Sequence, residues 1–187
     1  LANFWSVNFI TQWFGTLRAI ADAHVPDPGD KARLLALAAL AAADSQIAVY
    51  DSKYHYNLWR PVTAIQQGDA DRNSRTVGVA DWEPMVVTPP YQDYSSGANC
   101  LTASVTTILQ LFFGTDEFTY QVATTSPLAT INPRNYTRFS QAQEEMVDVR
   151  IWQGIHFRFA DTAGRTQGSR IGHWTFHKAL RPLPGKR

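Results

Sequence analysis

The sequence predicts an all-α fold, a helical bundle of about five or six helices joined by two long ordered loops. Apolar residues recur at the three- and four-residue spacing of an amphipathic helix in several long segments. No segment holds the alternation of a half-buried strand, and no long internal repeat is present. At 187 residues, with 44% hydrophobic and 18% charged residues, we expect one helical domain spanning residues 1–187.

The first half of the chain contains two long expected helices and a short one. The first is Phe4 to Ala23, which ends at a run rich in Pro and Asp. Asp30 is the expected N-cap of the second, Lys31 to about Tyr56, whose density in Ala and Leu predicts the central buried helix. Pro61 stops this pattern and begins a short helix, because proline fits the first helical position.

The second half begins with a loop. From Gln66 to Tyr94 the residues Gly, Asp, Asn and Pro predict a long ordered connection. A second connection, rich in Thr, Asn and Pro, extends from Gly114 to Asn135 and is expected to lack strands. The expected helices are Gly97 to Phe113, Ser140 to Trp152, and a last one from near His156 to about Lys178, after a break at Gly154.

Composition excludes several function classes. Seventeen Lys+Arg against sixteen Asp+Glu leave a formal charge of +1, so we expect no nucleic-acid partner and no broad attraction to an anionic bilayer. The longest apolar stretch, Leu34 to Ala43, is well short of the ~20 residues of a membrane span. A single cysteine, Cys100, allows no intrachain disulfide, and no Cys/His cluster has zinc spacing.

The first residues are rich in aromatic side chains. The chain begins at Leu1 and shows no basic start or apolar middle of a signal peptide, so we expect a processed or truncated chain that lacks an upstream portion. Phe4, Trp5, Phe9 and Trp13 lie close together, and such a density needs cover on more than one face. We therefore expect an oligomer, or association with a missing N-terminal segment.

Three short segments carry residues suited to an oxyanion. Lys53 and Arg60 are seven residues apart, a separation that places both cations on one face of a continuing helix. Ser96 and Gly97 lie where a loop becomes a helix, so free N–H groups and a hydroxyl favour an anion there. Taken singly, the cations are explained by snorkelling to water, and the serine by ordinary capping.

The third segment pairs a guanidinium with an imidazole. Arg150 precedes His156 by six residues, with Gly154 allowing a break between them, and a guanidinium grips an oxyanion with two parallel hydrogen bonds. Alone, His156 is explained as a satisfied core histidine. His173 and His177 have the four-residue spacing of a metal pair, but no third ligand lies within reach by sequence.

In combination, Lys-x6-Arg-Pro, Ser-Gly at a helix start and Arg-x5-His resemble a known three-part signature. It belongs to the superfamily that joins vanadium-dependent haloperoxidases, type 2 phosphatidic acid phosphatases and bacterial class A acid phosphatases. The resemblance spans about Lys53 to Asp161 and implies that superfamily's helical bundle. The aromatic residues between Tyr54 and Pro61, and those after His156, are most similar to soluble bacterial haloperoxidase-like members.

The resemblance implies a role for each site residue. Vanadate would be the cofactor, and phosphate can occupy the same site. Lys53, Arg60 and Arg150 would surround the oxyanion, while Ser96 and the Gly97 N–H would add hydrogen bonds. His156 would be the vanadium ligand, or the nucleophile of a phosphatase, and its pKa should lie below the ordinary value because three cations surround it.

Two positions depart from the family pattern. The family has an acid-base histidine directly after the Ser-Gly pair, where this chain has Ala98. Such a group contributes roughly 10²–10⁴-fold to rate, and a methyl group cannot move a proton. His55 is a substitute only if the fold brings it to the site. Asp161 follows His156 by five residues and is the possible orienting residue for its imidazole.

Three functions follow from these residues. The first is a vanadium-dependent haloperoxidase that oxidises halide with hydrogen peroxide. The second is an acid phosphatase that acts on a phosphate ester through a phosphohistidine at His156. The third, suggested by Ala98, is a non-catalytic relative that keeps the oxyanion site. Trp59, Trp82 and Tyr91 are candidates to line the mouth of the site.

Overall fold

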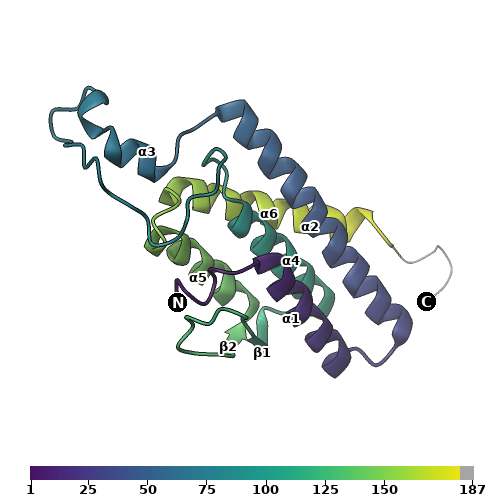
Figure 1. Cartoon of the computed structure of the whole chain (residues 1–187). Helices are drawn as coiled ribbons and strands as arrows, with labels where there is room; N and C mark the ends of the chain where they lie inside the picture. The colour runs from purple at the N-terminus through teal and green to yellow at the C-terminus, as the bar shows by residue number, and fades with distance from the viewer. Residues whose placement is uncertain (182–187) are drawn as a thin grey trace.

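The computed structural model describes residues 1–181, which form a mostly helical bundle with one small sheet (Figure 1). The all-α prediction is confirmed at the level of fold class. In chain order the elements are α1 (Phe9–His24), α2 (Pro28–Tyr56), α3 (Pro61–Gln66), the short 3₁₀ turn η1 (Gly68–Ala70), α4 (Gly97–Phe113), β1 (Glu117–Val122), β2 (Arg134–Arg138), α5 (Phe139–Trp152) and α6 (Arg158–Lys178).

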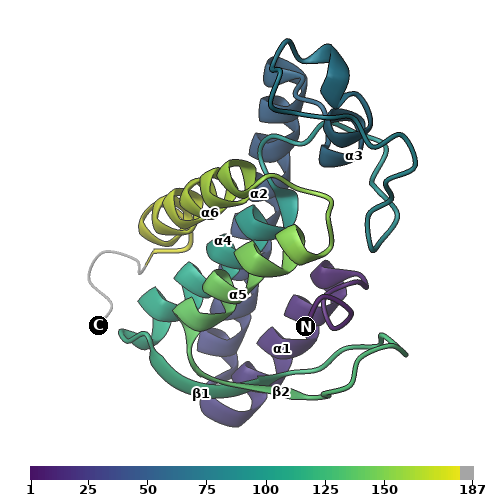
Figure 2. The same cartoon turned by 90° about the vertical axis from the view of Figure 1, so that its left-hand side faces the viewer.

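The helix at the centre of the bundle is α4. Every residue from Ala98 to Leu109 is buried, and α1, α2, α5 and α6 pack against this helix (Figures 1 and 2). The expectation that α2 is the central helix is therefore wrong. Alanine-rich α2 buries one face and exposes the other, where Leu40, Ile47 and Tyr54 are open to solvent.

Glycines allow α6 to lie directly on α4. Gly164, Gly168 and Gly172 are four residues apart, so they share one face of α6. A Cβ atom at any of these positions would collide with α4 or its first residues, at Ser96, Cys100 and Ser104. This close approach also places the Ser96 amide against the carbonyl of Ala160, which accepts its hydrogen bond at 3.1 Å.

A two-stranded antiparallel sheet lies in the connection that was expected to lack strands. Tyr120 of β1 pairs with Tyr136 of β2, and their rings stack with centroids 5.3 Å apart. Phe118, Tyr120 and Val122 alternate with polar residues, so the period-2 signal is present but only six residues long. The prediction of no strand is wrong because this short alternation is surrounded by loop-forming residues.

Helix starts differ from the expected ones at the N-terminal end of the chain. Asn8 caps α1 by accepting hydrogen bonds from Ile10 and Thr11, so the helix begins at Phe9 rather than Phe4. The N-cap of α2 is Asp27, which accepts from the amide of Asp30; the expected cap at Asp30 is wrong by three residues.

The residues before α1 pack into the molecule. Phe4 and Trp5 are buried, as is Trp13 of α1, so these three aromatic side chains find their cover within this chain. They therefore do not support the expectation of an oligomer, which stays a prediction.

The helical stretch Pro28–Gln66 is long and apolar enough to cross a membrane by length and composition alone. A core helix passes the same test.

Candidate oxyanion site

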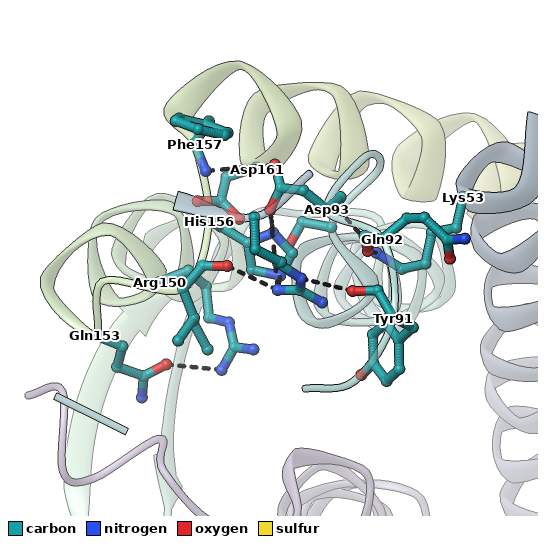
Figure 3. Close-up of polar contacts among 12 residues, drawn as sticks. Lys53, Tyr91, Gln92, Asp93, Arg150, Gln153, His156, Phe157 and Asp161 are labelled. Atoms are coloured by element: carbon teal, nitrogen blue, oxygen red, sulfur yellow. Dashed lines mark hydrogen bonds and ion pairs between the residues drawn. The ribbon is translucent and has the colours of Figure 1, made fainter. Parts of the chain in front are cut away.

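Three of the residues singled out in the sequence, Lys53, Arg150 and His156, lie around one buried point (Figure 3). A cavity of about 20 Å³ lies there, and Lys53, Gly97, Ala98, Arg150 and His156 are among its lining residues. They come from the end of α2, the start of α4, the end of α5 and the turn before α6. Three segments far apart in the sequence are thus brought together as predicted.

Two local turns deliver these side chains. Asn57, at φ +46°, ends α2 directly after the turn that carries Lys53, and Arg60 then serves as the N-cap of α3 before Pro61. Gly154, at φ +75°, reverses the chain after α5 and brings His156 back toward Arg150. The left-handed conformation at Gly154 disfavours residues with a Cβ atom, and such an atom would also meet Trp82.

Lys53 is held with its charge inside the protein. The side chain is 2% exposed, and its ammonium donates to the carbonyls of Gln92 and Asp93 at 2.7 and 2.9 Å. Burial and the neighbouring Arg60 lower the pKa of Lys53 to about 7. The ammonium group of Lys53 is therefore close to losing its proton at neutral pH, unless a nearby negative charge stabilises the charged form.

Arg60 links the loop before α4 to the turn that carries His156. Its Nε donates to the Tyr91 carbonyl at 2.9 Å, and its Nη1 donates to the Ile155 carbonyl at 2.7 Å. The same Nη1 lies 3.2 Å from Nε2 of His156, while Nη2 is buried without a hydrogen-bond partner among the described residues. An unsatisfied buried guanidinium edge is what an absent anion would leave.

The residue that touches the other ring nitrogen of His156 is Asp93. Its Oδ1 lies 2.5 Å from Nδ1, a close contact without the alignment of a regular hydrogen bond. Sequence reasoning missed Asp93, which lies in the loop expected from Gln66 to Tyr94. The only indication of Asp93 in the sequence is its position, because this carboxylate lies shortly before the Ser96-Gly97 pair.

These contacts select one state of the imidazole. A carboxylate at Nδ1 and a guanidinium donor at Nε2 favour the proton on Nδ1 and direct the lone pair of Nε2 toward Arg60. Burial, followed by Arg150, Arg60 and Lys53, holds the pKa of His156 well below its ordinary value, as predicted. Burial raises the pKa of Asp93 to about 6, so it is ionised at neutral pH.

Asp161 does not orient His156, and that expectation is corrected. Its Oδ1 accepts a hydrogen bond of 2.8 Å from Asn99, whose amide also donates to Ser96 Oγ at 3.1 Å. Burial raises the pKa of Asp161 to about 7, while Ser96 and Asn99 act in the opposite direction.

The remaining candidates are placed clearly. Ala98 lines the cavity, so a methyl group stands where the resemblance led us to expect an acid-base histidine. His55 packs on Tyr56 and does not line the cavity. Of the proposed mouth residues, Tyr91 lines the site but Trp59 and Trp82 do not. His173 and His177 stack on α6, and residues 1–181 contain no group of three metal-binding side chains.

Tyr91 covers the cations. Its ring centroid lies 5.2 Å from Lys53 Nζ and 5.1 Å from Arg60 Cζ, and Tyr50 packs against it edge-on. Tyr50 and Tyr91 are 40% and 39% exposed, and both line the cavity. The cavity has room for about one water molecule, so a larger oxyanion requires the lining side chains to move outward.

A mostly helical bundle in which three cations lie near a buried, neutral imidazole is the arrangement that the haloperoxidase resemblance led us to expect. Residues 33–185 match the family described as the VCPO second helical-bundle domain, and the chain belongs to this family within the vanadium haloperoxidase superfamily. No curated protein matches the chain.

Solved structures of bacterial enzymes resemble the fold. The structure of the first bacterial vanadium-dependent iodoperoxidase matches with a TM-score of 0.77 and 30% identity over 90% of this chain. Holo-type and apo-type bacterial vanadium-dependent chloroperoxidases match with TM-scores of 0.69 and 0.64, at 16% and 17% identity over 90% and 76% of the chain. The chain spans only 38%, 40% and 35% of these three relatives, in the order iodoperoxidase, holo-type and apo-type.

Proposed function

We propose that this chain provides the vanadate site of a haloperoxidase-like enzyme that oxidises halide with hydrogen peroxide. One observation carries the proposal: Lys53 and Arg150 line one cavity with a buried, neutral His156, and Nη1 of Arg60 lies 3.2 Å from Nε2 of that histidine. Three buried cations facing two carboxylates, Asp93 and Asp161, leave an excess of positive charge that an oxyanion would offset.

The residues present fit an oxyanion of this kind. Arg60 Nη2 and Arg150 Nε are buried and unpartnered among the described residues, and both are donors. Together with Lys53 they would hold the anion's oxygens, and the first amides of α4 at Gly97 would add donors. Bound vanadate would supply a Lewis-acid centre that activates hydrogen peroxide, and His156 would hold it through Nε2.

The weak point of the proposed enzyme is proton transfer. Ala98 lines the cavity where the family has a histidine, and no His55 side chain reaches the site in its place. A general acid or base contributes roughly 10²–10⁴-fold to rate. This observation favours a second candidate function, a relative that binds an oxyanion without turnover.

The test is halogenation with a matched gain-of-function variant. We expect the wild-type chain to bind vanadate and to halogenate a phenolic dye slowly with peroxide and bromide or iodide. Ala98→His should raise the rate by about 10²-fold or more without a comparable change in vanadate affinity. Vanadate binding without halogenation in either protein would establish the non-catalytic relative, and absence of vanadate binding would refute the proposed site.

A phosphatase remains the further alternative, with His156 as the nucleophile. An activated aryl phosphate has a leaving group that hardly needs a proton, so the gap at Ala98 would matter little for it. Turnover of this ester that vanadate inhibits and that His156→Ala abolishes would favour the phosphatase over the peroxidase.

A further inference from the structure

The Arg150 guanidinium is held by a single neutral side chain. Within residues 1–181 its one hydrogen bond runs from Nη1 to Oε1 of Gln153, at 2.7 Å (Figure 3). Its Nε is buried with no partner. The direction of this guanidinium therefore depends on Gln153 more than on any other described side chain.

Gln153 is itself fixed from three directions. The residue is fully buried, and its Nε2 donates to the carbonyl of Ala2 at 2.8 Å. Its backbone carbonyl accepts from the backbone amide of Met85 at 3.1 Å, and its backbone amide donates to the Val149 carbonyl at 2.9 Å. The N-terminal residues, the long loop and the end of α5 thus meet at one residue.

We infer that Gln153 is a positioning residue that aims the Arg150 guanidinium into the oxyanion site while leaving its charge uncompensated. An amide oxygen accepts a hydrogen bond from Arg150 but carries no charge, so the cation keeps its full attraction for an anion. A carboxylate at the same place would hold Arg150 at least as firmly, but it would neutralise the charge and repel the anion. This inference rests on the proposed oxyanion site.

The amide's neutrality gives a distinctive order of affinities. Gln153→Met keeps the shape and removes the hydrogen bond, and we expect inorganic phosphate or vanadate to bind about tenfold more weakly. Gln153→Glu keeps an acceptor for Arg150, yet we expect a larger loss, about a hundredfold, because of the added negative charge. Both variants lose the hydrogen bond to the Ala2 carbonyl, so a purely structural role predicts that glutamate, which keeps the contact with Arg150, is the milder replacement.

The measurement is calorimetric titration of the wild-type chain and both variants with phosphate and with vanadate. In an Arg150→Ala background, Gln153→Met should cause no further loss, because the group that it positions is gone. Gln143→Met is the matched control: Gln143 lies on α5, which Gln153 directly follows, and donates to Thr106 at 2.7 Å, so stability should fall while phosphate affinity stays unchanged.

The outcomes separate the inference from the proposed function. If the wild-type chain binds neither anion, the oxyanion site itself is refuted, and this inference with it. The positioning role alone is overturned if the wild-type chain binds an anion and both variants bind it as tightly as wild type. The same holds if Gln153→Glu binds the anion more tightly than Gln153→Met. Should Gln153→Met fail to fold, the comparison between wild type and Gln153→Glu decides alone.

Discussion

Several charged side chains in this molecule are buried, where the charged form of the side chain is unfavourable. Lys53 is 2% exposed and faces four charged groups. These are Arg60, Asp93, Arg150 and Asp161. Such an arrangement lowers the free energy of unfolding in the absence of an anion. Buried charges that are unfavourable in this way are typical of binding sites.

The pH dependence of stability should reveal Lys53. Its pKa is about 7 in the folded protein and 10.5 ordinarily, so above pH 7 the unfolded chain binds the additional proton. By linkage the unfolding free energy then rises with pH, by at most about 1.4 kcal/mol per pH unit. Urea unfolding between pH 7 and about 8.5 should show this rise.

Lys53→Met, which keeps the length of the side chain, should remove the rise. The window stops below pH 9 because burial raises the pKa of the Cys100 thiol to about 12, and this group acts in the opposite direction at higher pH. Asp93 and Asp161, with pKa values of about 6 and 7, act mainly below the window. Equal slopes in the two proteins would show that Lys53 is not the group responsible.

At the scale of elements, the contact between α4 and α6 decides the geometry of the site. The glycine face of α6 brings Ala160 within hydrogen-bond distance of Ser96, directly before the start of α4, where Gly97 and Ala98 line the cavity. A larger residue in this face would separate the two helices. The position of the site therefore depends on close contact between the backbones of α4 and α6, because the tightly packed interior leaves no room for larger residues there.

Gly168→Ala should destabilise the protein by about 1–3 kcal/mol, because the added methyl group meets the backbone of Cys100. The matched control is Gly15→Ala in α1, where no atom lies within 4 Å of the added Cβ. That change should be neutral or stabilise by up to about 1 kcal/mol, since alanine favours the helix. Thermal unfolding of the two variants tests the pair, and a shift of the same sign in both would contradict the argument.

At the scale of the whole molecule, the N-terminal residues are joined to the sheet and to α5 by one carboxylate. Glu145 Oε1 accepts from Trp5 Nε1 and from the Tyr136 hydroxyl, both at 2.8 Å, and Oε2 pairs with Arg134. Because Ala2 in turn supports Gln153, the packing of the chain's first residues is connected to the site.

Glu145→Ala should cost about 3 kcal/mol, since it leaves a buried hydroxyl and an indole N–H without their acceptor and Arg134 without its counter-ion. It should also speed amide exchange in residues 1–8. The neighbouring Glu144 is 56% exposed and pairs with Arg138 at 3.8 Å. Its replacement by Ala should change stability by less than about 1 kcal/mol, and an equal effect of the two variants would contradict the proposed role of Glu145.

The sequence by itself determined the helical class, most helix bounds and the three segments of the site. Helical periodicity, proline, and glycine at a helix end are local signals, so α3 begins at Pro61 and α4 begins and ends where they predict. The spacing of Lys53 and Arg60, and of Arg150 and His156, is likewise carried by each segment alone.

Only the tertiary structure decided which groups meet across segments. Asp93, rather than Asp161, contacts His156, and Gln153 holds Arg150 because Ala2 and Met85 hold Gln153. The central place of α4 follows from the close packing of α6 on its backbone, which the composition of α2 conceals. Contacts between residues far apart in the chain depend on how the elements pack, and no local spacing encodes that packing.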